Sequence, residues 1–450
     1  MRATIGSKTV DMTVGNEAGH LIRFAIPMLI GNLFQQLYNL VDSVIVGRYV
    51  GADALAAVGS TGSVTFLFFA LCNGIGSGGG IVASQFFGTK DDTSVRKTIS
   101  NTAYLMLFMS VVVGSLAYLL STPLLVFLDT PGTILNDALK YMRLQCIGLV
   151  FVALYNYAAS MLRALGDSRT PLYFLIFSCI LNAGLDIFFV YNLNMGVFGA
   201  ALATVLSQFI AGATCLGFAI KTNEYFRLSR EDLIMDRVII LKAVKLGVPL
   251  SMQFALIAIS CMALQKVVNG YGSTAVAAFT ATSRVEQVIH QPYQTLGASM
   301  STFSGQNYGA RKNDRVKSGL YKGLIMMAIF SALMLPVMQF GGRTIVRIFV
   351  SDADVIQMGA HALRLTSYFY VSLGMIYVVR GVMTGVGDGV FALQNGVVEV
   401  IGRFVFPVLF TAIPIMGLWG IWWSVGATWT ISGIAAFVRY YRYGKRLGIR

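Results

Sequence analysis

The sequence predicts an all-α polytopic membrane protein, because it is apolar, poor in charge and divided into long hydrophobic runs. Hydrophobic residues make up 56% of the 450 residues and charged residues only 12%, against about 25% charged residues in a typical soluble domain. Runs of about 20 hydrophobic residues, enough to cross roughly 30 Å of hydrocarbon, recur along almost the whole chain. Little sequence remains for a soluble domain.

The hydrophobic runs predict twelve transmembrane helices. In chain order they cover 22–46, 54–79, 98–120, 138–162, 170–191, 197–219, 240–268, 275–299, 318–340, 357–383, 391–412 and 417–438.

The basic residues indicate how the chain is oriented. A net charge of +14 is compatible with nucleic-acid binding, but most Lys and Arg residues fall on one side of the membrane if the N-terminus is cytoplasmic. This distribution follows the positive-inside rule, and it predicts cytoplasmic termini and contacts with lipid headgroups. We therefore expect no nucleic-acid partner.

The chain contains two similar halves. Segment 85–90 (QFFGTK) returns as 306–311 (QNYGAR), a shift of 221 residues, and 195–199 (MGVFG) returns at the same shift as 416–420 (MGLWG). Six spans per copy is an even number, so both copies enter the membrane in the same orientation and are parallel repeats.

Parallel repeats predict two six-helix lobes around a central cleft. We expect an N-lobe of residues 1–222, a cytoplasmic linker of residues 223–237 and a C-lobe of residues 238–450. This is the architecture of an alternating-access transporter, although duplication can also simply build a stable bundle. Pro27 and Gly76 are candidate hinges. The paired motifs Gly166-Asp167 and Gly387-Asp388 are expected to cap helices.

The first span carries a polar stripe. Asn32, Gln35, Asn39 and Asp42 fall within about 80° of arc on an ideal helix. An aspartate at the bilayer centre costs on the order of 3 kcal/mol, so the stripe must face the bundle interior or a water-filled cavity. We expect Gln35 and Asn39 to line that cavity.

A second polar cluster lies in the fifth span, where Asn182 and Asp186 are four residues apart and share a helix face. The directions of spans 1, 5 and 6 place Asp42, Asn182, Asp186 and Thr204 at similar depth. The residues 221 positions later are Ala263, Arg403, Pro407 and Val425. A functional N-lobe site is therefore favoured over buried structural polar groups. Its oxygens suit a proton or a sodium ion, with Asp42, Asn182 and Asp186 as candidate sodium ligands.

The C-lobe also carries charges within its spans: Arg284, Glu286, His290, Glu399 and Arg403. Glu286 and His290, like Glu399 and Arg403, are four residues apart. They either compensate each other internally or take part in substrate binding or coupling. The sequence leaves both interpretations open.

These motifs resemble those of the multidrug and toxic compound extrusion (MATE) family over essentially the full chain. The segments that carry the resemblance are Pro27 with Gln35, Asn39 and Asp42, then 83–90 (ASQFFGTK), 162–167 (LRALGD), 181–186 (LNAGLD) and 195–204 (MGVFGAALAT). The resemblance implies a prokaryotic transporter that exports lipophilic, often cationic compounds, driven by inward flow of H+ or Na+. It also implies that Asp42, Asn182, Asp186 and Thr204 form the cation site. Many members have an acidic residue in span 7, whereas residues 249–264 contain none.

We therefore expect a secondary active antiporter in the cytoplasmic membrane that works as a monomer. No enzymatic activity and no cofactor are expected, because the five cysteines and three histidines show no metal-ligand or nucleophile pattern. A flippase for a lipid-linked saccharide stays an alternative, although it favours a more basic cavity. A non-transporting membrane sensor is a further alternative.

Overall fold

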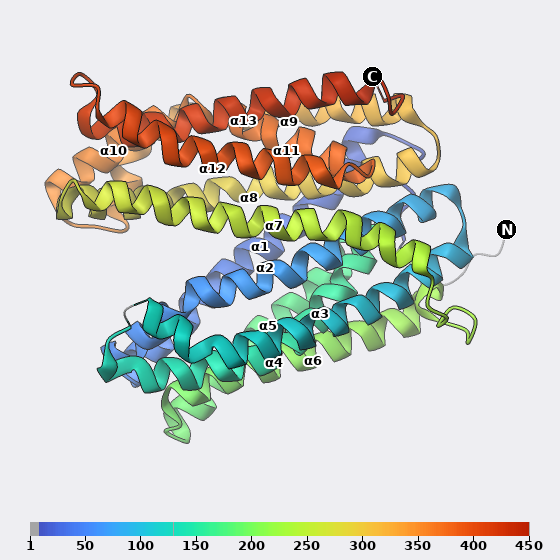
Figure 1. Ribbon diagram of the computed structural model, residues 1–450, viewed down its shortest axis with the longest axis horizontal. Helices are drawn as coiled ribbons and strands as arrows, with labels where there is room; N and C mark the ends of the chain where they lie inside the picture. The colour runs from blue at the N-terminus through green and yellow to red at the C-terminus, as the bar shows by residue number, and fades with distance from the viewer. Residues whose placement is uncertain (1–8, 129, 450) are drawn as a thin grey trace. The chain divides into compact units, whose positions relative to one another are not determined.

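The computed structural model describes residues 9–128 and 130–449, and this part of the chain is helical and contains no strand (Figure 1). Each expected span coincides with one helix or two consecutive helical segments, apart from residue 412, which follows the end of its helix. Nine described helices are long and apolar enough to cross a membrane, or ten if the bent pair α10 (Ala353–Ser367) and α11 (Tyr370–Gly385) is one span. The prediction of an all-α polytopic membrane protein is confirmed.

Two long helices are absent from that apolar set. They are α1 (Glu17–Tyr49, 33 residues) and α8 (Ser273–Gly309, 37 residues). Both exceed the roughly 20 residues that a membrane span needs, so their composition, not their length, separates them from the others. α1 contains the polar stripe and α8 contains Glu286 and His290, which are expensive to place in hydrocarbon.

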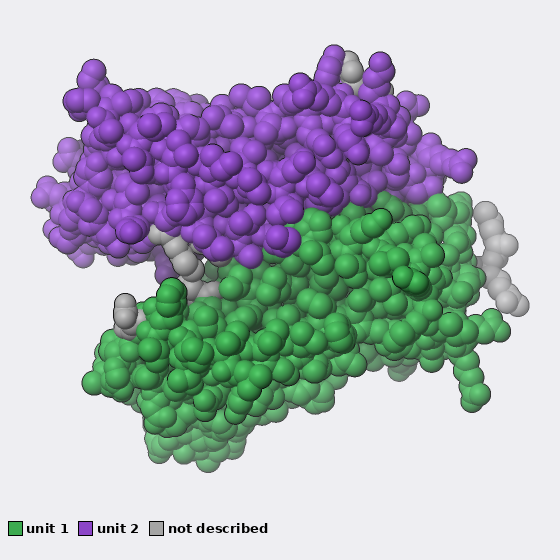
Figure 2. All heavy atoms as spheres, viewed as in Figure 1, with its two compact units in different colours: residues 1–11, 26–251 green, residues 12–25, 252–450 purple. Residues whose placement is uncertain are grey.

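The chain divides into two compact units, which Figure 2 colours separately. Unit 1 contains the residues up to Asp11 and Ile26–Ser251, and unit 2 contains Met12–Ala25 and the chain from Met252 onward. The borders fall inside α1 and α7 (Arg237–Asn269). Each of these two helices therefore begins in one unit and ends in the other.

In unit 1, α4 (Gly132–Ala164) is the central helix. It packs against α2 (Ala52–Thr89), α3 (Asp92–Phe127) and α6 (Gly196–Thr222). Small residues permit this packing, since a Cβ on Gly148 of α4 would lie 2.4 Å from the side chain of Val205 on α6, a contact that only glycine avoids. Unit 1 also contains α5 (Arg169–Asp186) with the π-helix η1 (Ile187–Asn192) and the 3-10 helix η2 (Glu224–Phe226).

In unit 2, α11 packs against α8, α9 (Asn313–Arg347) and α13 (Gly420–Gly444). The helix α12 (Gly389–Thr411) packs against α13. A Cβ on Gly381 of α11 would lie 2.2 Å from the carbonyl oxygen of Gly297 on α8, so these two backbones meet directly. α10 and α11 are bent by 53° relative to each other. Unit 2 also contains the 3-10 helix η3 (Gly417–Trp419).

The backbone repeats the 221-residue shift found in the sequence. Lys90 and Arg311, which the shift aligns, are both left-handed, with φ of 59° and 58°. The expected helix caps are also present. Asp167 accepts from the backbone N–H of Thr170 at 3.0 Å, and Asp388 accepts from that of Phe391 at 3.2 Å. Each aspartate thus satisfies a backbone donor at the start of a helix.

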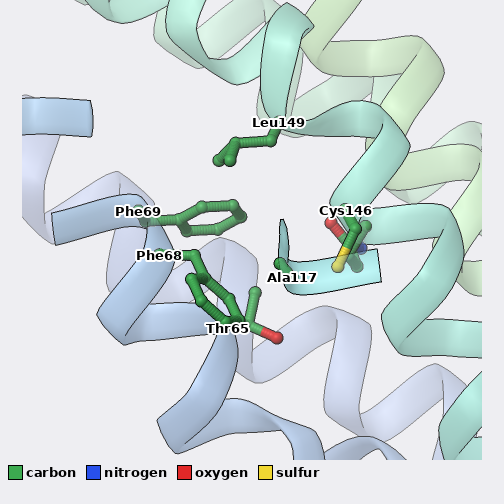
Figure 3. A pocket seen from close by; sticks show the side chains of 7 residues that line it. Thr65, Phe68, Phe69, Ala117, Cys146 and Leu149 are labelled. Carbon is green, nitrogen blue, oxygen red and sulfur yellow. The ribbon is translucent and has the colours of Figure 1, made fainter. Parts of the chain in front are cut away.

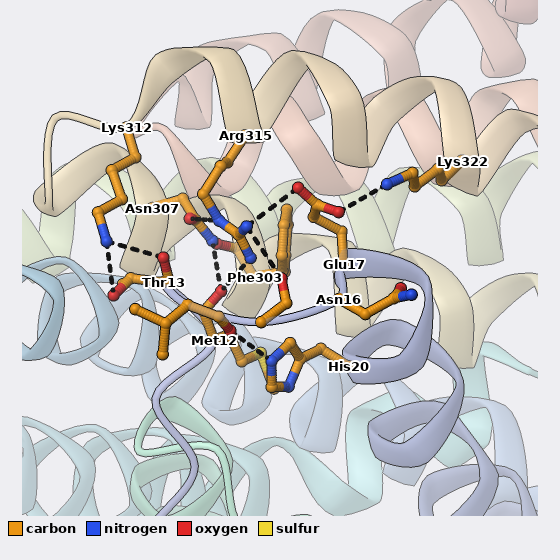
Figure 4. Close-up of polar contacts among 12 residues, drawn as sticks. Met12, Thr13, Asn16, Glu17, His20, Phe303, Asn307, Lys312, Arg315 and Lys322 are labelled. Carbon is orange, nitrogen blue, oxygen red and sulfur yellow. Dashed lines mark hydrogen bonds and ion pairs between the residues drawn. The ribbon is translucent and has the colours of Figure 1, made fainter.

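Residues 12–17, here called the N-terminal clasp, are held by the end of α8 and the start of α9 (Figure 4). Met12 donates its backbone N–H to Gln306 at 2.9 Å, and its carbonyl accepts from Asn307 and Arg315, each at 3.2 Å. Lys312 donates to the carbonyl of Thr13 at 2.8 Å. Side chains therefore satisfy the backbone of a segment that precedes the first helix.

Glu17 completes the clasp with two ion pairs. Its carboxylate lies 3.0 Å from Arg315 and 2.6 Å from Lys322. The hydrogen bond from Lys322, together with the charge of Arg315, lowers the pKa of Glu17 below its usual value. The start of α1 is therefore fixed to unit 2 by charge as well as by packing.

The segment before α7 is fixed in unit 1 in a similar way. Arg96 of α3 pairs with Asp232 at 3.2 Å, and Asn101 accepts from the backbone N–H of Asp236 at 2.9 Å. Further along, Ser251 donates to the carbonyl of Leu71 on α2 at 2.7 Å. In both repeats the segment that leads into the first helix is thus anchored by polar contacts.

Candidate functional site

Two carboxyl groups meet in the interior of unit 1. Asp42 of α1 is 8% exposed, and Asp186, the last residue of α5, is fully buried. The two carboxyl groups lie close enough to interact electrostatically, and a proton or a cation bound between them would relieve the repulsion of two like charges. The Oδ1 atoms of both residues have no hydrogen-bond partner among the described residues. Such orphaned oxygens are costly in a buried site unless a proton or a cation is bound.

Asn182 and Thr204 complete the cluster. With the amide of Asn182 oriented to suit its neighbours, its nitrogen donates to Asp186 Oδ2 at 2.8 Å and its oxygen accepts from the backbone N–H of Thr204 at 3.2 Å. Tyr38 of α1 donates to the hydroxyl of Thr204 at 3.3 Å. The structure thus brings together the four residues expected to share one depth.

The local structure explains this convergence. Asn182 and Asp186 are one helical turn apart on α5, so both face the same side. The π-helix η1 follows directly after Asp186, and such segments often lie at functional sites because they redirect side chains. The hydroxyl of Thr204 donates to the carbonyl of Ala200 within α6 at 3.1 Å, leaving its lone pairs for Tyr38.

The cluster has the donor atoms for a hard monovalent cation or a proton. Carboxylate, amide and hydroxyl oxygens are the ligands that hard cations prefer. In the described part of the chain, His, Cys, Asp and Glu form no group of three able to hold a metal ion, and only two carboxyl groups meet here. The composition therefore suits one positive charge better than a transition metal.

Sequence reasoning missed three neighbours of the two carboxyl groups. Tyr38 and Tyr141 lie close enough to interact electrostatically with both Asp42 and Asp186, and Gln145 lies beside Tyr141. The spacing of Tyr38, four residues before Asp42, was an available signal. Tyr141 and Gln145 lie on α4 and are uncharged, so the sequence offered no comparable signal for them.

Gln145 also lines a small cavity in unit 1 (Figure 3). The cavity measures about 10 Å³ and is lined by residues that include Thr65, Phe68, Gln145 and Cys146. This is room for about one water molecule. The hydroxyl of Thr65 has no described partner, so a water here would satisfy it beside Gln145.

The other predicted residues of the first two spans lie on α1 and α2. Gln35 is partly buried and Asn39 is exposed. Pro27 is buried inside α1. A Cβ on Gly76 of α2 would lie 3.2 Å from the sulfur of Met106, so this glycine permits close packing within unit 1. The cavity-lining and hinge roles of these residues stay predictions.

In unit 2, two arginines share one carboxylate, and we call Arg380, Glu399 and Arg403 the basic cluster. Arg380 lies 3.8 Å from one oxygen of Glu399, and Arg403 lies 3.8 Å from the other. The guanidinium of Arg403 also donates to Ser260 at 3.1 Å. The expected contact between Glu399 and Arg403 is present, and Arg380 is a partner that the sequence did not indicate.

Of the two interpretations left open for Glu286 and His290, the structure does not show mutual pairing, because no ion pair between them is present among the described residues. Oε1 of Glu286 and Nε2 of His290 are buried and have no hydrogen-bond partner among the described residues. His290 instead packs between the rings of Tyr377 and Trp429. Helical spacing placed the two side chains on one face, but their polar ends do not meet. Arg284 is exposed.

Comparison with known proteins agrees with this architecture. The MatE family model matches residues 27–188 and again 249–409, so it matches each half of the chain once. The chain is 33% identical to the probable multidrug resistance protein YpnP of Bacillus subtilis (strain 168), over 97% of this chain and 98% of that protein. It is 22% identical to the multidrug export protein MepA of Staphylococcus haemolyticus (strain JCSC1435), over 95% and 94%.

A solved structure shows the same fold. The crystal structure of MATE in the bent conformation superposes with a TM-score of 0.92 at 23% identity, covering 98% of this chain and 99% of that one. The resemblance seen in the sequence motifs is therefore confirmed. The chain belongs to the multidrug and toxic compound extrusion (MATE) family, whose members are membrane transporters and not enzymes.

Proposed function

We propose that this transporter is a secondary active antiporter that exports drugs and other toxic compounds. The observation that carries the proposal is the contact between Asp42 and Asp186, each with one oxygen lacking a partner. Ionisable groups inside a membrane protein are costly and usually serve ion or proton pathways. Entry of a cation would neutralise the pair and change how α1 packs, and this change would drive release of the exported compound.

The coupling ion in this proposal is a proton or a sodium ion. A proton would be shared by Asp42 and Asp186, whereas sodium would be held by oxygens of Asp42, Asn182 and Asp186, with Thr204 beside them. The buried amide of Asn182, which bridges Asp186 and Thr204, would orient the site for either ion. Family members need no cofactor, and the proposal requires none.

The proposed transport cycle is alternating access between the N-lobe (1–222) and the C-lobe (238–450), joined by the cytoplasmic linker 223–237. Pro27 lacks the N–H of a regular helix and weakens α1 at that point, so it is a candidate hinge, as is Gly76 in α2. Both termini would face the cytoplasm of a bacterial cell, with the protein in the cytoplasmic membrane.

The proposed substrates are lipophilic, often cationic small molecules. Relatives named for multidrug resistance or export span nearly the whole chain, and Gln35 and Asn39 would line the passage. The charged residues of the C-lobe (Arg284, Glu286, His290, Glu399 and Arg403) would contribute to substrate binding or coupling. The proposed working form is a monomer.

Purified protein in liposomes tests the proposal. Efflux of a fluorescent lipophilic cation is measured with a pH gradient or a sodium gradient, imposed separately. We expect one gradient to drive efflux in the wild type, and the Asp42→Asn variant to insert and fold but to lose driven efflux. The proposal is wrong if that variant exports at the wild-type rate.

A further inference from the structure

Unit 2 carries a guanidinium at one position that corresponds to the cation site, while Asp42 and Asp186 correspond to neutral residues. The 221-residue shift aligns Asn182 with Arg403 and Asn39 with Ser260. In unit 2 those two aligned residues touch, since Arg403 donates to the hydroxyl of Ser260 at 3.1 Å. The first and fifth helices of each repeat therefore carry different groups at the same positions. In unit 1 they are two amides, and in unit 2 they are a hydroxyl and a guanidinium.

The basic cluster has more positive than negative charge. Arg380 and Arg403 are only 14% and 12% exposed, and Glu399 is 7% exposed. Both ion pairs measure 3.8 Å, whereas well-made charged hydrogen bonds measure about 2.7–2.9 Å. No other carboxylate within the described chain lies within ion-pair distance of either guanidinium. One carboxylate, loosely held, therefore serves two buried arginines.

Neighbouring groups leave the remaining charge uncompensated by direct contact. The other partners of Arg403 are the neutral side chains of Ser260 and Cys261. Arg380 lies over the ring of Tyr377, 4.6 Å from its centroid. Glu286 interacts with Arg403 electrostatically but forms no ion pair with it. A guanidinium within a membrane span is costly unless it is paired or faces a polar ligand.

Unpartnered polar atoms surround the same region. Tyr370 is fully buried, yet its hydroxyl has no hydrogen-bond partner among the described residues. It lies near Glu286. In the described part of the chain, Oε1 of Glu286 and Nε2 of His290 also have no hydrogen-bond partner. Buried hydroxyl and imidazole N–H groups are donors that an anion accepts. A purely structural ion-pair network would leave fewer such groups unsatisfied.

We infer that the basic cluster binds the anionic group of an amphiphile, such as a carboxylate, sulfonate or phosphate, between Arg380 and Arg403. The planar guanidinium groups suit the two oxygens of such an anion. The inference rests on the proposed export function only in naming the ligand as an exported compound. It extends the substrates from lipophilic cations to zwitterions and amphiphilic anions.

Binding of a matched pair of fluorescent probes tests this site without any gradient. The probes are 11-(dansylamino)undecanoate and its methyl ester, which differ only in the negative charge. In nanodiscs of phosphatidylcholine we expect the wild type to bind the acid about tenfold more tightly than the ester, the usual effect of a hydrogen bond to a charged group. Equal affinity for both probes would overturn the inference.

Variants of the basic cluster test whether its arginines and its carboxylate control the affinity for the acid. Arg403→Gln should weaken binding of the acid about tenfold and leave the ester within about twofold. Glu399→Gln removes the competing carboxylate and should tighten binding of the acid. The Glu399→Gln variant therefore tests the inference even if the Arg403→Gln protein does not fold. Unchanged or weaker binding of the acid by a folded Glu399→Gln protein contradicts the inference.

Two controls separate this site from the proposed antiport. Arg343→Gln removes an exposed arginine of α9 in the same unit and should change neither affinity. Asp42→Asn should lose driven efflux but keep the preference for the acid. A wild type that binds the acid but exports nothing would refute the proposed function and leave the anion site standing.

The source of the anion is distinguished by adding phosphatidylglycerol to the nanodiscs. If the preference for the acid disappears at 30% phosphatidylglycerol, the ligand is a lipid phosphate. If the preference persists, the ligand is an exported compound. Both results require an anion at the basic cluster.

Discussion

The carboxylate of Glu17, the first residue of α1, lies 2.6 Å from Nζ of Lys322 on α9, a residue 305 positions later in the chain. Glu17 is 15% exposed at its side chain and also pairs with Arg315. The start of the first helix is therefore joined to the second half of the protein by a partly exposed ion pair. This relationship makes the N-terminal clasp accessible to measurement.

Replacing Glu17 with Gln should lower stability by about 1–2 kcal/mol, because the hydrogen bonds to charged partners are weakened. The pKa of Glu17 is lowered in the folded protein. Its contribution is thus fully present above the unfolded pKa of about 4.3 and is lost as the pH falls through the lower folded value. Thermal unfolding in detergent should show a constant difference at pH 6–8 that shrinks below about pH 4. The exposed Glu231→Gln variant should match the wild type, and an equal loss of stability in both variants would contradict a specific role for the clasp.

Asp186→Asn should reduce gradient-driven efflux roughly 100-fold, the equivalent of about 3 kcal/mol for a buried charged partner. Asp186 is fully buried against Asp42, so the amide removes the site where a cation or proton binds. Asp53 is exposed near the start of α2, and Asp53→Asn should export normally. Initial efflux rates from liposomes, with matched protein content, check both expectations. Efflux by Asp186→Asn at half the wild-type rate or more would exclude an essential role.

Thr204→Val should raise the coupling-ion concentration needed for half-maximal efflux about 5–10-fold. The substitution removes the hydroxyl that accepts from Tyr38, a loss of about 1–1.5 kcal/mol. Thr204→Ser keeps the hydroxyl and should stay within about twofold of the wild type. Titration of sodium, or of external pH, measures this constant. An equal shift in both variants would point to packing of the methyl group instead of the hydroxyl.

Gly78→Ala should destabilise unit 1 by about 1–3 kcal/mol. A Cβ at Gly78 of α2 would lie 2.5 Å from the carbonyl oxygen of Ala243 and 2.6 Å from the backbone nitrogen of Gly247, both on α7. Backbone atoms cannot rotate away, so the helices would have to separate. Gly62, on the same helix, has no atom within 4 Å of an added Cβ, and Gly62→Ala should be neutral or slightly stabilising. The melting temperatures of the two variants in detergent provide the comparison.

Hydropathy and self-comparison predicted most of the helical architecture. A membrane span must be long and apolar, so each span can be recognised from its own stretch of sequence. The depth argument grouped Asp42, Asn182, Asp186 and Thr204 because charge inside a span is conspicuous. Tyr141 and Gln145 escaped notice because an uncharged side chain on α4 carries no such signal.

Other features depend on which helix faces which, and local sequence does not contain that information. The spacing of Glu286 and His290 placed them on one face but did not reveal that Oε1 of Glu286 and Nε2 of His290 have no hydrogen-bond partner among the described residues. Arg380 pairs with Glu399 from a different helix, so no helical spacing predicts the contact. The exchange of Met12–Ala25 into unit 2 is likewise a tertiary property.

That exchange has a consequence for biosynthesis. Glu17 is made 305 residues before Lys322, which corresponds to roughly 15–60 s at synthesis rates of about 5–20 residues per second. During that interval residues 12–25 have left the ribosome, but the helices that hold them do not yet exist. A fragment that contains only the second half of the chain would lack residues 12–25, which belong to unit 2. Neither half of the chain therefore contains all the residues of its own unit. Residues 12–25 are synthesised early but are among the last to reach their final partners.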